Sequence, residues 1–309
     1  MQVYQIKLFG KIQVICGQQP LVDFPAKAQE LLAFLLLHPQ HPHTREALAV
    51  QLWENASDAH SKKYLRQTLW QLQSGLHDGL STSCPALLIA EDGWVYINPQ
   101  ADVALDVATF VRAYHETQDI PDHALTETRM QTLSQAIALY EGELLRGWYQ
   151  DWCVLERERL RAMALAMLDK LVGYCLQNRQ FEQGIQYAMR MLRFDNTREK
   201  THRQLMHLYY LSGDRTSALR QFNHCVDALS QEFGARPTAI TQTLHAHILA
   251  DRTDMWSSYA RPVEERPSAR EDVLVKVLEE FKRIAADLSL LRSDVETIKQ
   301  ALRQGNSLS

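Results

Sequence analysis

Side chains that could read DNA lie on one face of a helix predicted over residues 58–76. Successive helical residues are rotated by about 100°, so Lys63, Arg66 and Gln67 lie together, and Trp70 follows on the same face. Lysine and arginine can bind phosphate or guanine, and glutamine can make a two-point contact with adenine. Trp70 could pack against the sugar-phosphate wall or a thymine methyl. The pattern therefore predicts a helix that enters the major groove.

Two further residues could support that contact. Lys62 lies at the helix start and nearer the buried side, where a backbone phosphate is the expected partner, and Trp94 follows Gly93 and could reach the edge of the minor groove. The alternative is an ordinary solvated helix face. That alternative has weight because residues 1–100 carry seven basic and eight acidic side chains, and non-specific affinity for DNA comes mostly from neutralised phosphates.

Motifs for catalysis and metal binding are missing from the sequence. It contains no P-loop, no GxGxxG after a strand, no HExxH and no GxSxG, so we expect neither an enzyme nor a cofactor. His38, His41 and His43 gather in HPQHPH, but no Cys or carboxylate close in sequence completes a metal shell. No metal site is expected. The five cysteines are scattered without a CxxC pair, as is typical of reduced thiols in a cytoplasm.

The first hundred residues combine short strands with three helices. Helices are predicted over 26–37 and 45–53 in addition to the one that carries the candidate residues. That third helix has a buried stripe at helical spacing, formed by Leu65, Leu69, Leu72 and Leu76. Strands are predicted at 6–9, 12–15 and 21–24, and a hairpin at 87–90 and 94–97. This order of elements predicts a winged helix-turn-helix (α+β) over residues 1–102.

Helical patterns alone follow over residues 103–250. Two stretches repeat at an offset of 34 residues, with Gly184 matching Ala218 and Leu171 matching Leu205. Thirty-four residues is the period of the tetratricopeptide repeat, a pair of antiparallel helices. The fold class is therefore mainly α, with a tetratricopeptide-like repeat domain after the winged helix.

The C-terminal region predicts a linker and a coiled coil. Residues 251–269 contain two prolines and many charges, as linkers do. Four heptads over 270–303 predict an oligomerisation helix, whose a and d positions are Leu274, Val277, Phe281, Ile284, Leu288, Leu291, Val295, Ile298 and Leu302. Acidic g and basic e positions suit parallel chains, and each exposed pair is worth only about 0.2–1 kcal/mol. Packing of this helix back onto its own repeat domain is the alternative.

Arginines at helix starts are a second candidate site. Arg157 and Arg161 are one turn apart in the predicted repeat domain and could bind an anionic effector. Pairing with neighbouring acids such as Glu156 and Glu158 is the more common arrangement on exposed helices.

Composition restricts the class of protein. The 309 residues, 46% of them hydrophobic, fit two domains or three small units. The longest apolar run, 31–37, is far short of the ~20 residues that cross a bilayer, and no export signal follows Met1. We therefore expect a cytoplasmic protein with no membrane contact. The formal charge of −4 gives no global reason to expect nucleic acid.

The ordered motifs resemble those of SARP-type (antibiotic regulatory protein) transcription factors. The winged-helix half is matched by the segments Phe24-Pro25-Ala26-Lys27, Thr44-Arg45-Glu46-Ala47-Leu48, Leu65-Arg66-Gln67 and Gly93-Trp94-Val95-Tyr96-Ile97. The second half resembles the bacterial transcriptional activator domain (BTAD) in its segments Tyr140-Glu141-Gly142-Glu143-Leu144-Leu145 and Glu156-Arg157-Glu158-Arg159-Leu160. The resemblance covers about residues 5–250.

That resemblance implies a bacterial activator whose recognition helix reads promoter direct repeats while the repeat domain helps to recruit RNA polymerase. Lys63, Arg66 and Gln67 match the DNA-facing positions of the family. We thus expect a sequence-specific activator that binds double-stranded DNA and forms homo-oligomers through a parallel C-terminal coiled coil. The alternative is a tetratricopeptide adaptor with a vestigial winged helix that binds protein or an anionic small molecule.

Overall fold

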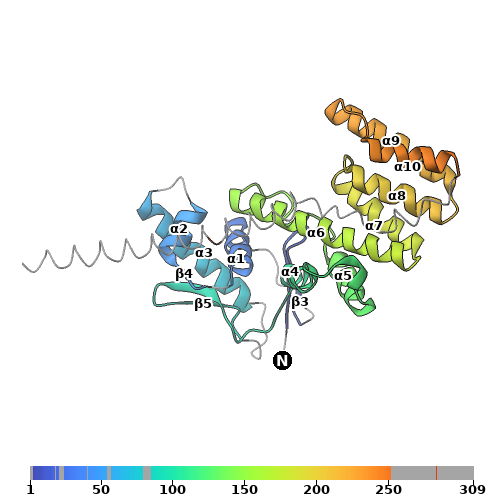
Figure 1. Ribbon diagram of the computed structural model, residues 1–309. Coiled ribbons are helices and arrows are strands. Elements are labelled where there is room, and N and C mark those ends of the chain that lie inside the picture. Colours follow the sequence, from blue (N-terminus) through green and yellow to red (C-terminus); the bar gives the residue numbers. More distant parts are fainter. Residues whose placement is uncertain are drawn as a thin grey trace, which may run out of the picture. The chain divides into compact units, whose positions relative to one another are not determined.

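The computed structural model describes residues 3–17, 19–20, 24–39, 41–53, 57–78, 85–251 and 283 (Figure 1). The chain divides into two compact units. Within the described residues, the first unit contains the chain up to Thr109, Glu141–Glu156 and Arg283, and the second contains Phe110–Tyr140 and residues 157–251. Except for Asp251 and Arg283, the predicted linker and coiled coil lie outside the described residues.

A four-stranded sheet opens the first unit, in the order β3-β2-β1-β7. Its strands are β1 (Tyr4–Lys7), β2 (Gln13–Cys16), β3 (Gln19–Pro20) and β7 (Val103–Leu105). The prediction that helices alone follow residue 103 is wrong at β7, which pairs in parallel with β1. A three-residue strand has no periodic signature of its own, so only its distant partner reveals it.

The helix-turn-helix follows, with its helices close to the predicted bounds. They are α1 (Ala26–Leu37), α2 (Arg45–Leu52) and α3 (Asp58–Asp78). Thr44 caps α2 as expected, because its Oγ1 accepts a hydrogen bond from Ala47 N at 3.2 Å. Nine of the twelve residues of α1 are buried, including all of its apolar second half, residues 31–37.

Two local contacts set the position of these helices. Lys27 of α1 donates a hydrogen bond from Nζ to the Leu52 carbonyl at 2.8 Å, which satisfies an open carbonyl at the end of α2. Gly75 of α3 packs against Phe24, and a Cβ on Gly75 would lie 2.8 Å from the phenyl ring. The glycine therefore permits a close approach between α3 and Phe24, two residues before α1.

The hairpin forms a second, three-stranded sheet in the order β4-β6-β5. Its strands are β4 (His43–Thr44), β5 (Leu88–Glu91) and β6 (Trp94–Ile97). Asp92 and Gly93 both have positive φ, 49° and 83°. Two left-handed residues in a two-residue hairpin loop are the pattern of a type I′ turn, for which Asp-Gly is a preferred sequence. The predicted wing is therefore present.

Buried Asp106 joins the end of β1 to the start of α4 (Asp106–Thr117). Its carboxylate accepts hydrogen bonds from the backbone N–H groups of Leu8, Phe9 and Val107 at 2.7–3.0 Å. The chain beyond β1 thus bonds to a side chain instead of extending the ladder. This explains why the strand predicted at 6–9 ends at Lys7.

The first unit also contains a segment from far along the chain. Gly10 N donates to the Glu143 carbonyl at 2.8 Å, and Leu145 N donates to the Leu8 carbonyl at 2.9 Å. The motif Tyr140–Leu145 therefore contributes backbone pairing to the strand edge. The structural division thus differs from the predicted boundary between residues 102 and 103, because 103–109 and 141–156 belong to the first unit.

The second unit consists of paired helices, and Figure 1 shows α7, α8, α9 and α10 together in one helical stack. The helices predicted as two repeats are α6 with α7 and α8 with α9, and α10 packs against the last pair. Gly184 permits close contact between α7 and α8, because a Cβ there would lie 2.8 Å from Leu208. The bounds of the helices are α5 (Glu127–Leu139), α6 (Asp151–Gln177), α7 (Phe181–Phe194), α8 (Glu199–Leu211), α9 (Arg215–Phe233) and α10 (Ala239–Leu249), with a 3-10 turn η1 (Asp122–Ala124).

Among the described residues, no helix is long and apolar enough to cross a bilayer.

Candidate nucleic-acid interface

The outer face of α3 carries the predicted DNA-reading residues together. Lys63, Arg66 and Gln67 are exposed, and the indole of Trp70 is 68% exposed. The opposite face is anchored by the leucine stripe, which is at most 4% exposed at Leu65, Leu69, Leu72 and Leu76. Burial of the stripe fixes the rotation of α3, so the four candidate side chains project outward from a rigid element.

The charge on this face differs from that of the domain. Between its terminal residues Asp58 and Asp78, α3 contains no acidic residue, whereas it has three basic ones. A local positive surface can therefore exist on a winged helix whose total charge is slightly negative. Affinity for a phosphate backbone depends on the charges within about one Debye length of it.

Lys62 lies beside an acidic side chain of α2. It is exposed, and its Nζ lies 3.4 Å from Oε1 of Glu46 in the first turn of α2. Both side chains are about half exposed, at 48% and 55%. Such exposed pairs contribute little stability. Lys62 could therefore leave Glu46 and pair with a phosphate instead.

The wing presents Trp94 at the end of an acidic turn. Trp94 is 40% exposed, and its neighbours Glu91 and Asp92 are exposed carboxylates. The start of α2 is tied to this hairpin, because Arg45 N donates to the Gly93 carbonyl at 3.0 Å. DNA phosphates repel the carboxylates of Glu91 and Asp92. Of the exposed residues in this turn, the uncharged Trp94 is therefore the one that suits contact with the edge of a groove.

An aromatic group beside the helix-turn-helix was missed by the sequence argument. Tyr64 is 42% exposed, and its ring stacks on His60 with centroids 6.2 Å apart and lies 6.2 Å from the ring of Trp53. Lys27 Nζ lies 5.5 Å from the centre of the Trp53 ring. The spacing of His60 and Tyr64, one helical turn apart, could have indicated this aromatic group from the sequence.

The arginines proposed to bind an effector are engaged within the protein. Arg161 lies 3.5 Å from Glu158 Oε2 and also donates a hydrogen bond to the Phe194 carbonyl at the end of α7. Arg157 likewise has a partner in the structure. This arrangement favours the pairing alternative at Arg161, where the guanidinium closes a helix end.

The histidine segment holds itself together by local bonds. His38 Nδ1 lies 3.1 Å from the Phe34 carbonyl, and His43 Nε2 lies 3.1 Å from the His38 carbonyl. Burial lowers the pKa of His43. In the part of the chain that the structure describes, no group of three or more His, Cys, Asp or Glu residues is placed to hold a metal.

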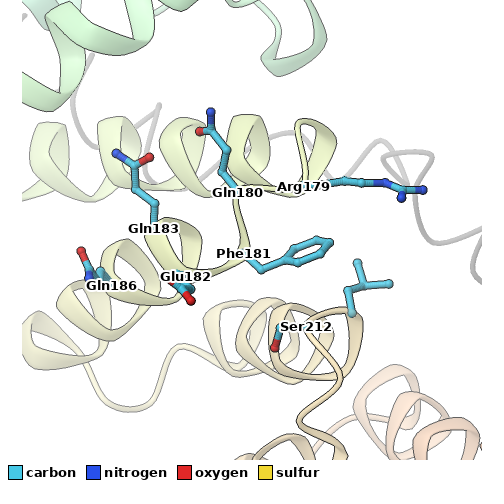
Figure 2. A pocket seen from close by; sticks show the side chains of 8 residues that line it. Arg179, Gln180, Phe181, Glu182, Gln183, Gln186 and Ser212 are labelled. Carbon is cyan, nitrogen blue, oxygen red and sulfur yellow. The ribbon is translucent and has the colours of Figure 1, made fainter.

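A groove of about 740 Å³ lies where α7 begins and α8 ends. Figure 2 shows Gln180 and Gln183 pointing to one side of this region, while Phe181 and Ser212 lie on the other and Arg179 extends away. Side chains that diverge in this way do not surround a common ligand atom. The groove is therefore a weaker candidate than the outer face of α3.

Comparisons with known proteins agree with this architecture. Residues 105–249 match the family described as bacterial transcriptional activator domain. The chain is 25% identical over 245 residues to the regulatory protein AfsR of Streptomyces coelicolor. That match covers 78% of this chain and 24% of AfsR, so the chain spans about a quarter of its relative's length.

A solved structure shows the same fold. Mycobacterium tuberculosis EmbR, determined in complex with a low-affinity phosphopeptide, superposes with a TM-score of 0.64 at 18% identity. The match covers 93% of this chain and 72% of that one. Residues 105–249 therefore match a bacterial transcriptional activator domain, and the chain is similar to the regulatory protein AfsR in sequence and to EmbR in fold.

Proposed function

We propose that the protein is a sequence-specific transcriptional activator whose helix α3 enters the major groove of double-stranded DNA at promoter direct repeats. One observation carries the proposal. Lys63, Arg66, Gln67 and Trp70 are exposed together on the face of α3 that lies opposite its buried leucines. A positioned helix with basic and amide side chains has the chemistry needed to read base edges.

A single copy of this interface binds weakly under the proposal. Each phosphate neutralised by Lys or Arg adds about 0.9 to the slope of log affinity against log salt, and α3 supplies only Lys62, Lys63 and Arg66. Specific recognition at physiological salt therefore needs more than one copy. Linked modules bind at a raised effective concentration, which adds affinity without new contacts.

Oligomerisation through the C-terminal heptads would supply those copies. We propose that residues 270–303 form a parallel coiled coil through the apolar positions from Leu274 to Leu302. Light scattering on the full chain and on a chain ending at Asp251 tests this directly. The full chain should have a mass of at least two protomers and the shortened chain a mass of one. Equal numbers of protomers in both would contradict the coiled coil.

The helical second unit would contact a protein partner, and RNA polymerase is the partner that an activator requires. A second candidate function is an adaptor that binds protein alone. The observation that favours it is the acidic turn of the wing at Glu91 and Asp92, together with the near-neutral charge of residues 1–100. DNA binding by the full chain separates the two candidates.

The decisive experiment selects duplexes from a random-sequence DNA library with the full chain at about physiological salt, where non-specific binding is weak. A Lys63→Ala/Arg66→Ala variant runs in parallel. An Arg112→Ala/Arg220→Ala variant is the matched control, because it removes the same charge from exposed positions of the helical unit.

Enriched duplexes should share spaced direct repeats for the unmodified chain and for the control. The Lys63→Ala/Arg66→Ala variant should enrich none of them. Absence of enrichment by all three proteins, with each folded by circular dichroism, would reject the activator and favour the adaptor. Equal enrichment by all three would remove α3 from the interface.

A further inference from the structure

A pocket of about 400 Å³ lies in the second unit, where α7, α8 and α9 meet. Its apolar walls are formed by Met189, Leu192, Leu205 and Ala228. Such a volume lies at the lower end of the range of small-molecule sites. The proposed DNA-binding function makes no use of it.

Two polar residues within the lining are almost completely buried. His202 is 2% exposed and Gln221 is 7% exposed, and both line the pocket. Buried polar groups need hydrogen-bond partners, so their bonds show which atoms remain for a ligand.

The bonds of His202 determine where its proton lies. His202 Nε2 is 2.8 Å from the Asn196 carbonyl, which can only accept, so Nε2 carries the hydrogen. Burial lowers the pKa of His202, so the ring is neutral near pH 7. A neutral ring with its hydrogen on Nε2 has an acceptor at Nδ1.

Gln221 is oriented by that acceptor. Its Nε2 lies 2.7 Å from His202 Nδ1 and must donate to it. This bond fixes the orientation of the Gln221 carboxamide, so its Oε1 points away from His202 Nδ1. Within the described part of the chain, Oε1 of Gln221 forms no hydrogen bond with a protein group and is open to solvent. Because Gln221 lines the pocket, this acceptor is available to a ligand that enters it.

The charged groups of the pocket lie at its entrance. Arg193 and Asp227 line it and are exposed, as are the polar side chains of His224 and Gln231. These exposed groups remain hydrated. The buried lining contains no charged side chain that could pair with a charged ligand. The buried part of the lining, at His202, Leu205 and Gln221, is therefore suited to an uncharged group.

We propose that this pocket binds a small uncharged molecule that carries one N–H or O–H donor on an apolar ring, as indole and p-cresol do. The ring contacts Met189, Leu192 and Leu205, and its donor bonds to Oε1 of Gln221. An analogue without the donor would displace water from this acceptor without replacing the hydrogen bond, so it should bind about tenfold more weakly.

The test uses the full chain with ¹³C-labelled methionine methyl groups and two pairs of probes. Indole is compared with 1-methylindole, and p-cresol with 4-methylanisole, because methylation removes the donor and retains the ring. The Met189 methyl signal, assigned with Met189→Leu, reports binding at this pocket. Indole and p-cresol should shift that signal to saturation, and their methylated analogues should bind about tenfold more weakly.

Two variants separate this pocket from other sites. Ala228→Phe fills the pocket while it retains the His202–Gln221 pair, and it should abolish the indole shift. Ala246→Phe places the same side chain on the exposed surface of α10 and should leave the shift unchanged. Gln221→Leu removes the acceptor and should bring the affinity ratio of indole to 1-methylindole close to one, which keeps the test decisive if Ala228→Phe does not fold.

Equal affinity for indole and 1-methylindole in the unmodified chain would overturn the proposal. So would indole binding that survives in folded Ala228→Phe, or the absence of any shift at Met189 with every probe. None of these outcomes depends on DNA binding, so this inference and the proposed function can fail separately.

Discussion

Lys62 of α3 and Glu46 of α2 form an ion pair across the helix-turn-helix, with Nζ and Oε1 3.4 Å apart. Because both side chains are about half exposed, the pair stabilises the fold by less than about 1 kcal/mol. We expect the pair to have a larger effect on the affinity for DNA. Glu46 places a negative charge beside the face that we propose contacts phosphates, and it competes with phosphate for Lys62.

Replacement of Glu46 by Gln should therefore strengthen DNA binding. We expect about three- to tenfold higher affinity at low salt for specific and non-specific duplexes alike, because Lys62 then neutralises a phosphate without competition. Fluorescence anisotropy at two salt concentrations measures the change. Glu232→Gln removes the same charge from an exposed position on α9, and an equal gain in that control would attribute the effect to net charge alone.

Truncation of Leu72 should destabilise the first unit. Leu72 is 0% exposed on the buried face of α3, so Leu72→Ala should lower the free energy of unfolding by about 2–5 kcal/mol. Urea denaturation followed by tryptophan fluorescence is suitable, because five of the six tryptophans belong to this unit. Its exposed neighbour is the control, since Gln73→Ala should change the value by no more than about 0.5 kcal/mol.

Asp106→Asn tests the junction between β1 and α4. The carboxylate accepts three backbone N–H groups through its two oxygens, whereas an amide turns a donor toward some of them. We expect a loss of about 1–3 kcal/mol in the free energy of unfolding, measured as for Leu72. Exposed Asp102→Asn carries the same change in charge, and an equal loss there would show that the hydrogen bonds of Asp106 are not the cause.

Acid should weaken the second unit through His207. Burial lowers the pKa of this side chain to about 4 from its usual 6.5. Between those values the unfolded chain binds a proton that the folded chain excludes, so stability is full above pH 6.5 and falls as the pH drops toward 4. At pH 5 the loss is about 2 kcal/mol, and burial lowers the pKa of His202 and His245 in the same direction.

Far-UV circular dichroism in urea at pH 7.5 and pH 5 measures this loss. His207→Gln cannot gain the proton and should show a smaller decrease in stability between the two pH values. His115→Gln removes an exposed histidine from α4 and should retain the full decrease. If His207→Gln and the unmodified chain respond equally to acid, His207 is not the group that titrates.

Elements that are marked by a cap, a periodic stripe or a turn residue could be predicted from the amino-acid sequence. Thr44 predicted the start of α2, the leucine spacing predicted which face of α3 is buried, and Gly93 predicted the turn of the wing. These signals are reliable because a cap, a stripe or a tight turn involves only residues within about one or two turns of each other. The 34-residue offset likewise predicted the paired helices, because it repeats a whole packing unit.

Contacts between residues far apart in the sequence became visible in the folded chain alone. The pairing of β7 with β1, the return of Glu143 to Gly10 and the bond between His202 and Gln221 join residues with no shared periodicity. Such contacts form when the chain closes a loop, and their free energy depends on burial that no local pattern records. For this reason the sequence located the outer face of α3, whereas the oriented acceptor beside α7, α8 and α9 required the folded chain.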